Sequence, residues 1–302
     1  MQNVEGINTV EISEISKSFN NTKVVDSISF NVMRGEILGL IGPNGAGKTT
    51  TIRMVMDIIK PDSGEINVLG ESLNGDTKNR IGYLPEERGL YKKLTVFQSL
   101  SYLASLKGIE TRLVNSRTDD LLERVGMLPH KRKKIEELSR GMGQLIQFLT
   151  TIIHDPRLII LDEPFANLDP INTELLKEII IELRGQGKAI ILSTHRMNEV
   201  EELCDRILMV NEGRDVLYGE LTEIKSRFRN NSIFLKCDRL PDKLSGVVGS
   251  KDQGKYLELL LDEHTIPQEV LSALISNGVI VDRFEVSTPS LNEIFIQVVK
   301  AE

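Results

Sequence analysis

The stretch "EILGLIGPNGAGKTT", residues 36–50, decides the fold of this chain. Its first part is almost wholly apolar, as in a strand that is buried in a parallel sheet. Residues 42–49 then have the pattern G-x-x-x-x-G-K-[ST] of a phosphate-binding loop. A helix is expected from Lys48 to about Ile59, where "KPDSG" ends it. The stretch therefore predicts an α/β domain that binds a nucleotide.

The residue types of this loop each suit phosphate chemistry. The glycines let the backbone approach the β-phosphate and direct N–H groups at it. Lys48 supplies a positive charge to the β- and γ-phosphates, Thr49 can place its hydroxyl on Mg²⁺, and Thr50 can contact the α-phosphate side. A plain glycine-rich turn is the alternative, but it explains neither the Lys nor the preceding strand. The predicted nucleotide-binding residues are Gly42, Pro43, Asn44, Gly45, Ala46, Gly47, Lys48, Thr49 and Thr50.

A second motif, "LIILDEP" at residues 158–164, supplies carboxylates. Asp162 follows an apolar strand, at the strand end where open α/β sheets bind ligands, and it is expected to hold Mg²⁺ through water. Glu163 can orient and activate the attacking water. A surface turn is the alternative reading of "DEP" alone. Together the two motifs predict hydrolysis of a nucleoside triphosphate, and the absence of an "NKxD"-like guanine reader favours ATP.

The remaining pattern indicates alternating strands and helices. Strands are expected at 9–15 and 24–32, a strand pair around "GEINVLG" (64–70) and "RIGYL" (80–84), and a helical region from Thr95 to about Gly126. Strands return at "RLIILDEP", "KAIILSTH" and "RILMVNEGR", each after a helical segment. This alternation predicts a mostly parallel sheet.

The composition changes near residue 220, so two domains are expected, 1–220 and 221–302. The second should be a small α+β domain. Its strands are expected at 232–237, 256–261 and 278–286, and its helices near 267–277 and 289–299.

Bulk composition excludes several classes of protein. A net charge of −7 and a pI near 5.4 argue against nucleic-acid binding. No stretch has the roughly 20 apolar residues that span a bilayer, and the N-terminus lacks a signal-peptide pattern. Cys204 and Cys237 fit neither a disulfide framework nor a metal site, which is typical of reduced cysteines in a cytosolic protein.

The order of the motifs resembles that of the ATP-binding cassette (ABC) ATPases over roughly residues 8–220. Gly42–Thr49 corresponds to the Walker A loop, "LSRGM" (138–142) to the LSGGQ signature and Leu158–Glu163 to Walker B. The resemblance implies a mostly parallel RecA-like core, an antiparallel β subdomain and an α-helical subdomain. It further implies a D-loop at Asn167, Leu168 and Asp169, a switch histidine at His195 that contacts the γ-phosphate, and an adenine-stacking ring at Phe19.

The signature departs from its commonest form. Ser139 by itself predicts a helix N-cap. The resemblance adds that Ser139, Arg140, Gly141 and Met142 act on the ATP of a second copy. Arg140 and Met142 replace a Gly and a Gln, as in many ABC-2-type exporter ATPases, and Arg140 has no account from the sequence.

The segment "LPEERGLYKKLTV", residues 84–96, departs as well. Glu86 stands where the family usually has the Q-loop glutamine, and its carboxylate is expected to coordinate Mg²⁺. The alternative is an exposed loop Glu beside Glu87. In the family this segment borders the groove that receives the membrane subunit. Its cations, Arg88, Lys92 and Lys93, are therefore expected to contact that subunit. The alternative is that they are simply solvated.

The resemblance implies an ATPase subunit that dimerises, with itself or a paralogue, around two ATP/Mg²⁺ and drives a separate transmembrane permease. The tail "TPSLNEIFIQVVK" resembles the C-terminal domain of sodium- and antibiotic-efflux subunits, which favours export of a sodium, drug or peptide cargo at the cytoplasmic face of the membrane. The alternatives are a non-transport ABC ATPase on a ribosome or DNA complex, and a stand-alone P-loop kinase or switch. The single P-loop, the short interval between Lys48 and Asp162, and "LSRGM" argue against them.

Overall fold

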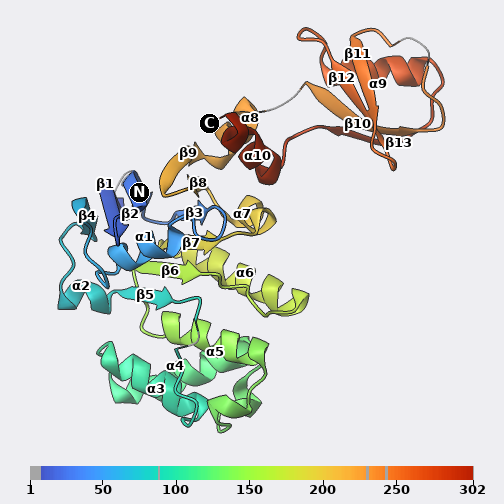
Figure 1. Cartoon of the computed structure of the whole chain (residues 1–302). Helices are drawn as coiled ribbons and strands as arrows, with labels where there is room; N and C mark the ends of the chain where they lie inside the picture. The colour runs from blue at the N-terminus through green and yellow to red at the C-terminus, as the bar shows by residue number, and fades with distance from the viewer. Residues whose placement is uncertain (1–7, 88, 229–230, 242–243, 302) are drawn as a thin grey trace, which may run out of the picture. The chain divides into compact units, whose positions relative to one another are not determined.

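The computed structural model describes residues 8–87, 89–228, 231–241 and 244–301 (Figure 1). The chain divides into two compact units, Met1–Leu221 and Thr222–Glu302, and each is described by itself.

The first unit is built on a six-stranded sheet with the order β5-β6-β7-β3-β8-β9. The strands are parallel except β9, which pairs antiparallel with β8. Every residue of β3, β6 and β7 is buried, as expected of a parallel sheet that is covered on both faces. The strands are β3 (Ile37–Ile41), β5 (Ile81–Leu84), β6 (Leu158–Asp162), β7 (Ala189–Thr194), β8 (Arg206–Asn211) and β9 (Arg214–Glu220).

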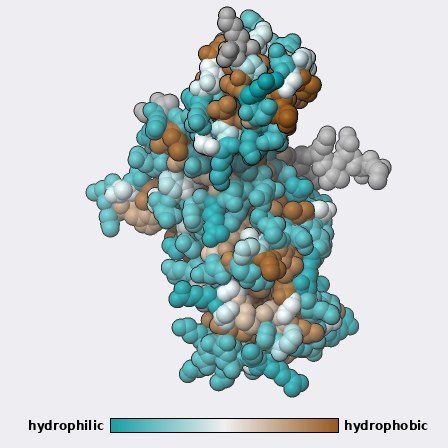
Figure 2. All heavy atoms as spheres, turned by 90° about the vertical axis from the view of Figure 1, so that its right-hand side faces the viewer, coloured by the Kyte–Doolittle hydropathy of each residue, from teal (hydrophilic) through white to brown (hydrophobic). Residues whose placement is uncertain are grey.

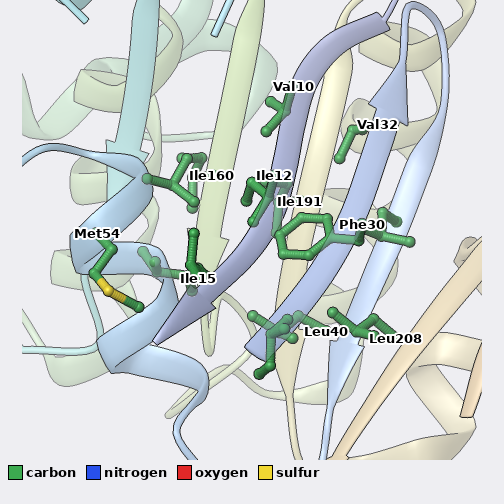
Figure 3. Close-up of a cluster of buried hydrophobic side chains, with 14 of the residues drawn as sticks. Val10, Ile12, Ile15, Phe30, Val32, Leu40, Met54, Ile160, Ile191 and Leu208 are labelled. Carbon is green, nitrogen blue, oxygen red and sulfur yellow. The ribbon is translucent and has the colours of Figure 1, made fainter. Parts of the chain in front are cut away.

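A three-stranded antiparallel sheet, β2-β1-β4, packs against the larger sheet. Its strands are β1 (Asn8–Phe19), β2 (Thr22–Met33) and β4 (Ser63–Val68). Figure 3 shows Ile12 and Phe30 of this sheet facing Ile191 of the larger one, in a buried apolar cluster that also contains Met54 of helix α1 (Lys48–Val55). This cluster holds α1, and hence the glycine loop before it, against the sheet.

The helices of the first unit form two groups. Helices α1, α2 (Gly75–Asn79), α6 (Pro170–Gly185) and α7 (Met197–Leu203) connect strands of the sheets. Helix α8 (Leu221–Arg227) begins at the last residue of this unit and otherwise belongs to the second. The second group lies beyond β5 in Figure 1 and comprises α3 (Val96–Leu106), α4 (Thr111–Arg124), α5 (Arg140–Ile152) and two 3₁₀ turns, Leu128–His130 and Ile135–Glu137. Thr95 and Gln98 form a capping box at the start of α3.

The second unit has a four-stranded antiparallel sheet, β11-β12-β10-β13. Val270 and Leu274 of α9 pack with Ile233 and Leu259 in its apolar core. The elements are β10 (Ser232–Cys237), β11 (Val247–Asp252), β12 (Leu257–Leu261), α9 (Pro267–Ser276), β13 (Val281–Val286) and α10 (Leu291–Ala301). The predicted α/β class, with parallel, antiparallel, helical and C-terminal α+β parts, is confirmed.

Several sequence predictions of elements are wrong. The strands near 64–70 and 80–84 do not pair with each other, because β4 joins β1 while β5, buried on both sides, joins β6. Helix α1 ends at Val55 rather than near Ile59, since Asp57 has a left-handed φ of 55°. By contrast, the helical region expected over 95–126 is confirmed; it consists of two helices, α3 and α4, separated at Gly108, whose φ is 78°. Strands β9 and β11 and helix α8 were not predicted.

The face of the molecule drawn in Figure 2 is mainly polar. Hydrophilic side chains cover most of the face in Figure 2, and apolar residues form small separate groups there. Within the described ranges no helix is long and apolar enough to cross a membrane. Both cysteines are free, Cys204 in the core and Cys237 half-buried.

Candidate active site

The glycine loop between β3 and α1 has the conformation that its sequence requires. Gly42 and Gly47 have φ values of 152° and 105°. A Cβ on Gly42 would lie 2.1 Å from the carbonyl oxygen of Val210, and one on Gly47 would lie 2.7 Å from that of Val24. Both positions therefore exclude a side chain on two independent grounds, backbone conformation and space.

A cavity of about 340 Å³ opens beside this loop. Glu86, Asp162 and Glu163 join residues of the loop in its lining, although they come from the ends of two other strands: Glu86 follows β5, Asp162 is the last residue of β6, and Glu163 comes next. The cavity lies at the carboxyl ends of these parallel strands, where such sheets bind ligands. Its lining consists of Val24, Asn44, Gly45, Gly47, Lys48, Thr49, Thr50, Glu86, Asp162 and Glu163.

Among the described residues that line the cavity, Lys48 is the only cation, and it is itself 8% exposed. Its Nζ donates to the carbonyl oxygens of Gly42 (2.8 Å) and Pro43 (3.0 Å). Burial lowers the pKa of Lys48, and the carboxylates of Glu163, Asp162 and Glu86 oppose that shift. The ammonium is thus placed among carboxylates in a partly desolvated cavity, where an anion such as a phosphate gains the most from it.

Asp162 and Thr49 meet across the cavity floor. The Thr49 hydroxyl donates to Asp162 Oδ2 at 3.3 Å, and Asp162 is 1% exposed. Burial raises the pKa of Asp162, and the carboxylates of Glu86 and Glu163 also raise it. Hard oxygen ligands of this kind fit Mg²⁺. Nowhere in the described ranges do three His, Cys, Asp or Glu side chains form a metal-binding group of their own. The oxygen donors of Thr49 and Asp162 suit Mg²⁺, which in nucleotide sites is usually bound by one or two carboxylates together with substrate phosphates.

The Glu163 side chain is held by the end of β7. Its backbone adopts a left-handed φ of 51°, and its N–H donates to Ser193 O at 2.9 Å. Glu163 Oε1 accepts from the His195 backbone N–H at 3.0 Å and lies 2.7 Å from His195 Nδ1, while the Thr194 hydroxyl donates to Oε2 at 3.2 Å. His195 does not line the cavity itself and reaches it through Glu163.

The signature lies at the start of α5, and the predicted N-cap is confirmed. The Met142 N–H donates to Ser139 Oγ at 3.2 Å. Ser139 and Arg140 are exposed, and none of residues 139–142 is among those that line the cavity. A Cβ on Gly141 would lie 3.1 Å from the carbonyl oxygen of Asn167, so the signature touches the predicted D-loop within one chain.

The predicted D-loop leads directly into α6. Asn167 has a left-handed φ of 64°, and Leu168 N–H donates to Phe165 O at 3.3 Å. Asp169 caps α6 by accepting from Asn172 N–H at 3.0 Å. These bonds lower the pKa of Asp169.

Two predicted features lie apart from the cavity. Phe19 ends β1, is 45% exposed, and has Lys17 Nζ 5.8 Å from its ring centroid. Of the cations expected at the docking segment, Lys92 and Lys93 are exposed, whereas Arg88 lies outside the described residues. Tyr91 in the same segment is exposed and meets the Tyr102 ring edge-on at 5.7 Å.

The sequence did not single out two glutamines of α5. Gln144 Nε2 donates to Pro164 O at 3.0 Å, directly after Glu163, and Gln147 Nε2 donates to the carbonyls beside Glu86. Both lie in the stretch "QLIQFL", which reads as apolar overall. The signal for them was a polar side chain repeated at i and i+3 within a buried helix face.

This fold and cavity define a P-loop nucleoside-triphosphate-binding protein. The ABC transporter family matches residues 25–166, and the family described as "ATP-binding protein DrrA1-3-like, C-terminal domain" matches residues 219–299. The chain belongs to the ATP-binding proteins of ABC transporters, which bind ATP and hydrolyse it to power transport.

Individual relatives agree with this assignment. The ABC transporter ATP-binding protein YhaQ of Bacillus subtilis (strain 168) is 41% identical over 96% of this chain and 98% of its own length. The linearmycin resistance ATP-binding protein LnrL of the same organism is 35% identical over 74% of this chain and 73% of its own. A solved ATP-binding subunit of an ABC transporter superposes with a TM-score of 0.69 at 31% identity, over 73% of this chain and 93% of that one.

Proposed function

We propose that two copies of this chain, or one copy and a paralogue, enclose two ATP·Mg²⁺ between them and drive a separate permease that exports its cargo. The position of the signature carries the proposal. Ser139 and Arg140 are exposed at the N-terminus of α5, and the cavity of their own chain is lined by other residues. A helix N-terminus favours a phosphate, so this one suits the γ-phosphate held by a second copy.

Within one chain, the loop residues 42–50 bind the nucleotide phosphates through backbone N–H groups and Lys48. Thr49 and Asp162 hold Mg²⁺ and Glu86 adds a further oxygen, since all three line one cavity. The ion, when bound, neutralises charge on the phosphate oxygens. The exposed Phe19 ring stacks on the adenine.

Glu163 acts as the general base on the attacking water. Its carboxylate is only 12% exposed, and Thr194 and His195 hold it in one orientation. With His195 Nδ1 directed at Glu163, Nε2 is the ring nitrogen that meets the γ-phosphate. His195 thereby contacts both the general base Glu163 and the γ-phosphate.

Mixing two inactive chains tests the shared site. Ser139→Arg removes one half of each composite site, and Lys48→Ala removes the other half. Random pairing places half of the chains in mixed dimers with one intact site each, so about a quarter of the wild-type ATPase rate should return. If the mixture stays as inactive as either parent, the two-chain site is refuted.

Purification of the tagged chain from its native membranes tests whether its partner is a membrane permease. The expected result is co-purification of a polytopic membrane protein in a fixed ratio. Recovery on ribosomes, with no membrane protein, would overturn the transport assignment. Export is supported by the similarity to the linearmycin resistance ATP-binding protein LnrL and by the match of the C-terminal domain.

A further inference from the structure

Helix α5 contacts both acidic loops of the cavity through buried amides. Gln144 and Gln147 are 3% and 4% exposed. Gln147 Nε2 donates to Pro85 O and to Glu87 O, each at 3.1 Å. Those two carbonyls flank Glu86, whose side chain lines the cavity. One amide group therefore holds the backbone on both sides of a single functional residue.

The geometry leaves Gln147 little choice of orientation. An amide NH₂ has two hydrogens, and here each has one carbonyl acceptor. Gln147 Oε1 is buried with no hydrogen-bond partner in the part of the chain that the structure describes. Turning the amide over would place Oε1 against two carbonyl oxygens, so the nitrogen must face the loop. An unpaired buried oxygen is unfavourable, and its presence shows that Gln147 is directed at the loop rather than at a core network.

The same helix carries the signature at its other end. Gln147 follows the Ser139 N-cap by about two turns, which is about 12 Å along a rigid helix. Farther along, a Cβ on Gly82 of β5 would lie only 2.3 Å from Thr151 O, so α5 and β5 are in direct backbone contact. The backbone around Glu86 is therefore attached to α5 at two places, through Gln147 and through β5.

We propose that Gln147 is a positioning residue that sets the location of Glu86 in the Mg²⁺·ATP cavity and ties it to the signature helix. This inference rests on the proposed role of Glu86 toward Mg²⁺. This contact would couple the two composite sites. The phosphate held by the second copy would bind at Ser139 and displace α5, and Gln147 would pass that displacement to Glu86 in the cavity of its own chain.

The test compares Gln147→Met, which keeps the length but removes both donors, with Thr151→Val as a matched control. Thr151 lies one turn farther on α5 and is 3% exposed, and its hydroxyl donates to Gln147 O at 3.0 Å and lies 3.4 Å from Tyr83 O, away from the 85–87 carbonyls. Hydrogen exchange of peptides spanning residues 85–93, which exclude the Tyr83 carbonyl that Thr151 contacts, is measured without nucleotide. Exchange there should rise several-fold in Gln147→Met and stay at the wild-type rate in Thr151→Val. Unchanged exchange in Gln147→Met overturns the proposal.

A second readout uses the Mg²⁺ concentration for half-maximal ATPase rate at saturating ATP. Gln147→Met should raise it about tenfold, which corresponds to about 1.4 kcal/mol. Glu86→Gln should raise it as well, and the double variant should match Glu86→Gln alone because both act through one carboxylate. Additive shifts overturn the proposal. If Glu86→Gln leaves the Mg²⁺ requirement unchanged, the role of Glu86 toward Mg²⁺ is wrong, and hydrogen exchange alone then decides whether Gln147 holds the loop.

Discussion

Gly82→Ala is the substitution whose effect the structure defines most sharply. Gly82 lies inside β5 and is not among the glycines with positive φ, so strand propensity by itself favours alanine there. In the fold, the added Cβ would meet Thr151 O at 2.3 Å and both Pro156 Cγ and Thr151 Cγ2 at 3.1 Å. An ordinary C···O contact is about 3.3 Å or longer, so β5 and α5 must separate by about 1 Å.

The size of the effect follows from two opposing contributions. Overpacking costs about 1–3 kcal/mol, and the upper end applies because the nearest atom is backbone. Replacing a strand glycine returns about 0.5–1 kcal/mol of conformational entropy. The net loss is about 2 kcal/mol, which lowers the melting temperature of a domain of this size by about 4–8 °C. Because α5 moves away, the Mg²⁺ requirement should rise as in Gln147→Met.

Gly185→Ala is the matched control. Gly185 is the last residue of helix α6, and a Cβ there would have nothing within 4 Å. Alanine favours the helix by up to about 1 kcal/mol over glycine, so this variant should melt at or above the wild-type temperature. Thermal unfolding of both full-length variants, followed by circular dichroism, measures the difference. A Gly82→Ala protein at least as stable as wild type would refute the close approach of β5 and α5.

Three further predictions concern the site and its support. Glu163→Gln should lower the ATPase kcat by about 10²- to 10⁴-fold while ATP affinity is kept. Glu178→Gln, at an exposed position of α6, is the control that should behave like wild type. A kcat of Glu163→Gln within threefold of wild type would remove Glu163 as the base. Phe19→Ala should weaken ATP binding by about 1–3 kcal/mol in a calorimetric titration, whereas Phe19→Tyr should not. An ATP affinity of Phe19→Ala equal to that of wild type would show that the ring does not stack on the adenine. Burial lowers the pKa of His154 from 6.5 to about 4. As the pH falls from 6.5 to 4, His154 therefore takes up a proton in the unfolded chain but not in the folded one. The free energy of unfolding falls by up to about 3 kcal/mol over this window. His154→Gln should show a flatter denaturation profile over that window, and identical profiles would contradict this account.

The sequence predicted the parts of the protein that are specified locally. The glycine loop needs left-handed φ values and space at Gly42 and Gly47, and its pattern alone states both requirements. The buried strand that ends at Asp162 and the Ser139 cap were likewise recognisable from a few residues. Burial on both faces requires a continuous apolar run, and an unpaired N–H at a helix start favours a Ser before it. The family resemblance then followed from the order of these motifs.

Only the tertiary structure decided which distant residues meet. Strands β4 and β5 are neighbours in sequence but belong to different sheets, since partner choice depends on which faces are buried. The contact of His195 with Glu163 and the bonds from Gln147 to Pro85 and Glu87 join segments far apart in the chain. A side-chain amide bonded to a remote carbonyl has no local sequence signature, because its geometry exists only once the helix and the sheet are packed together.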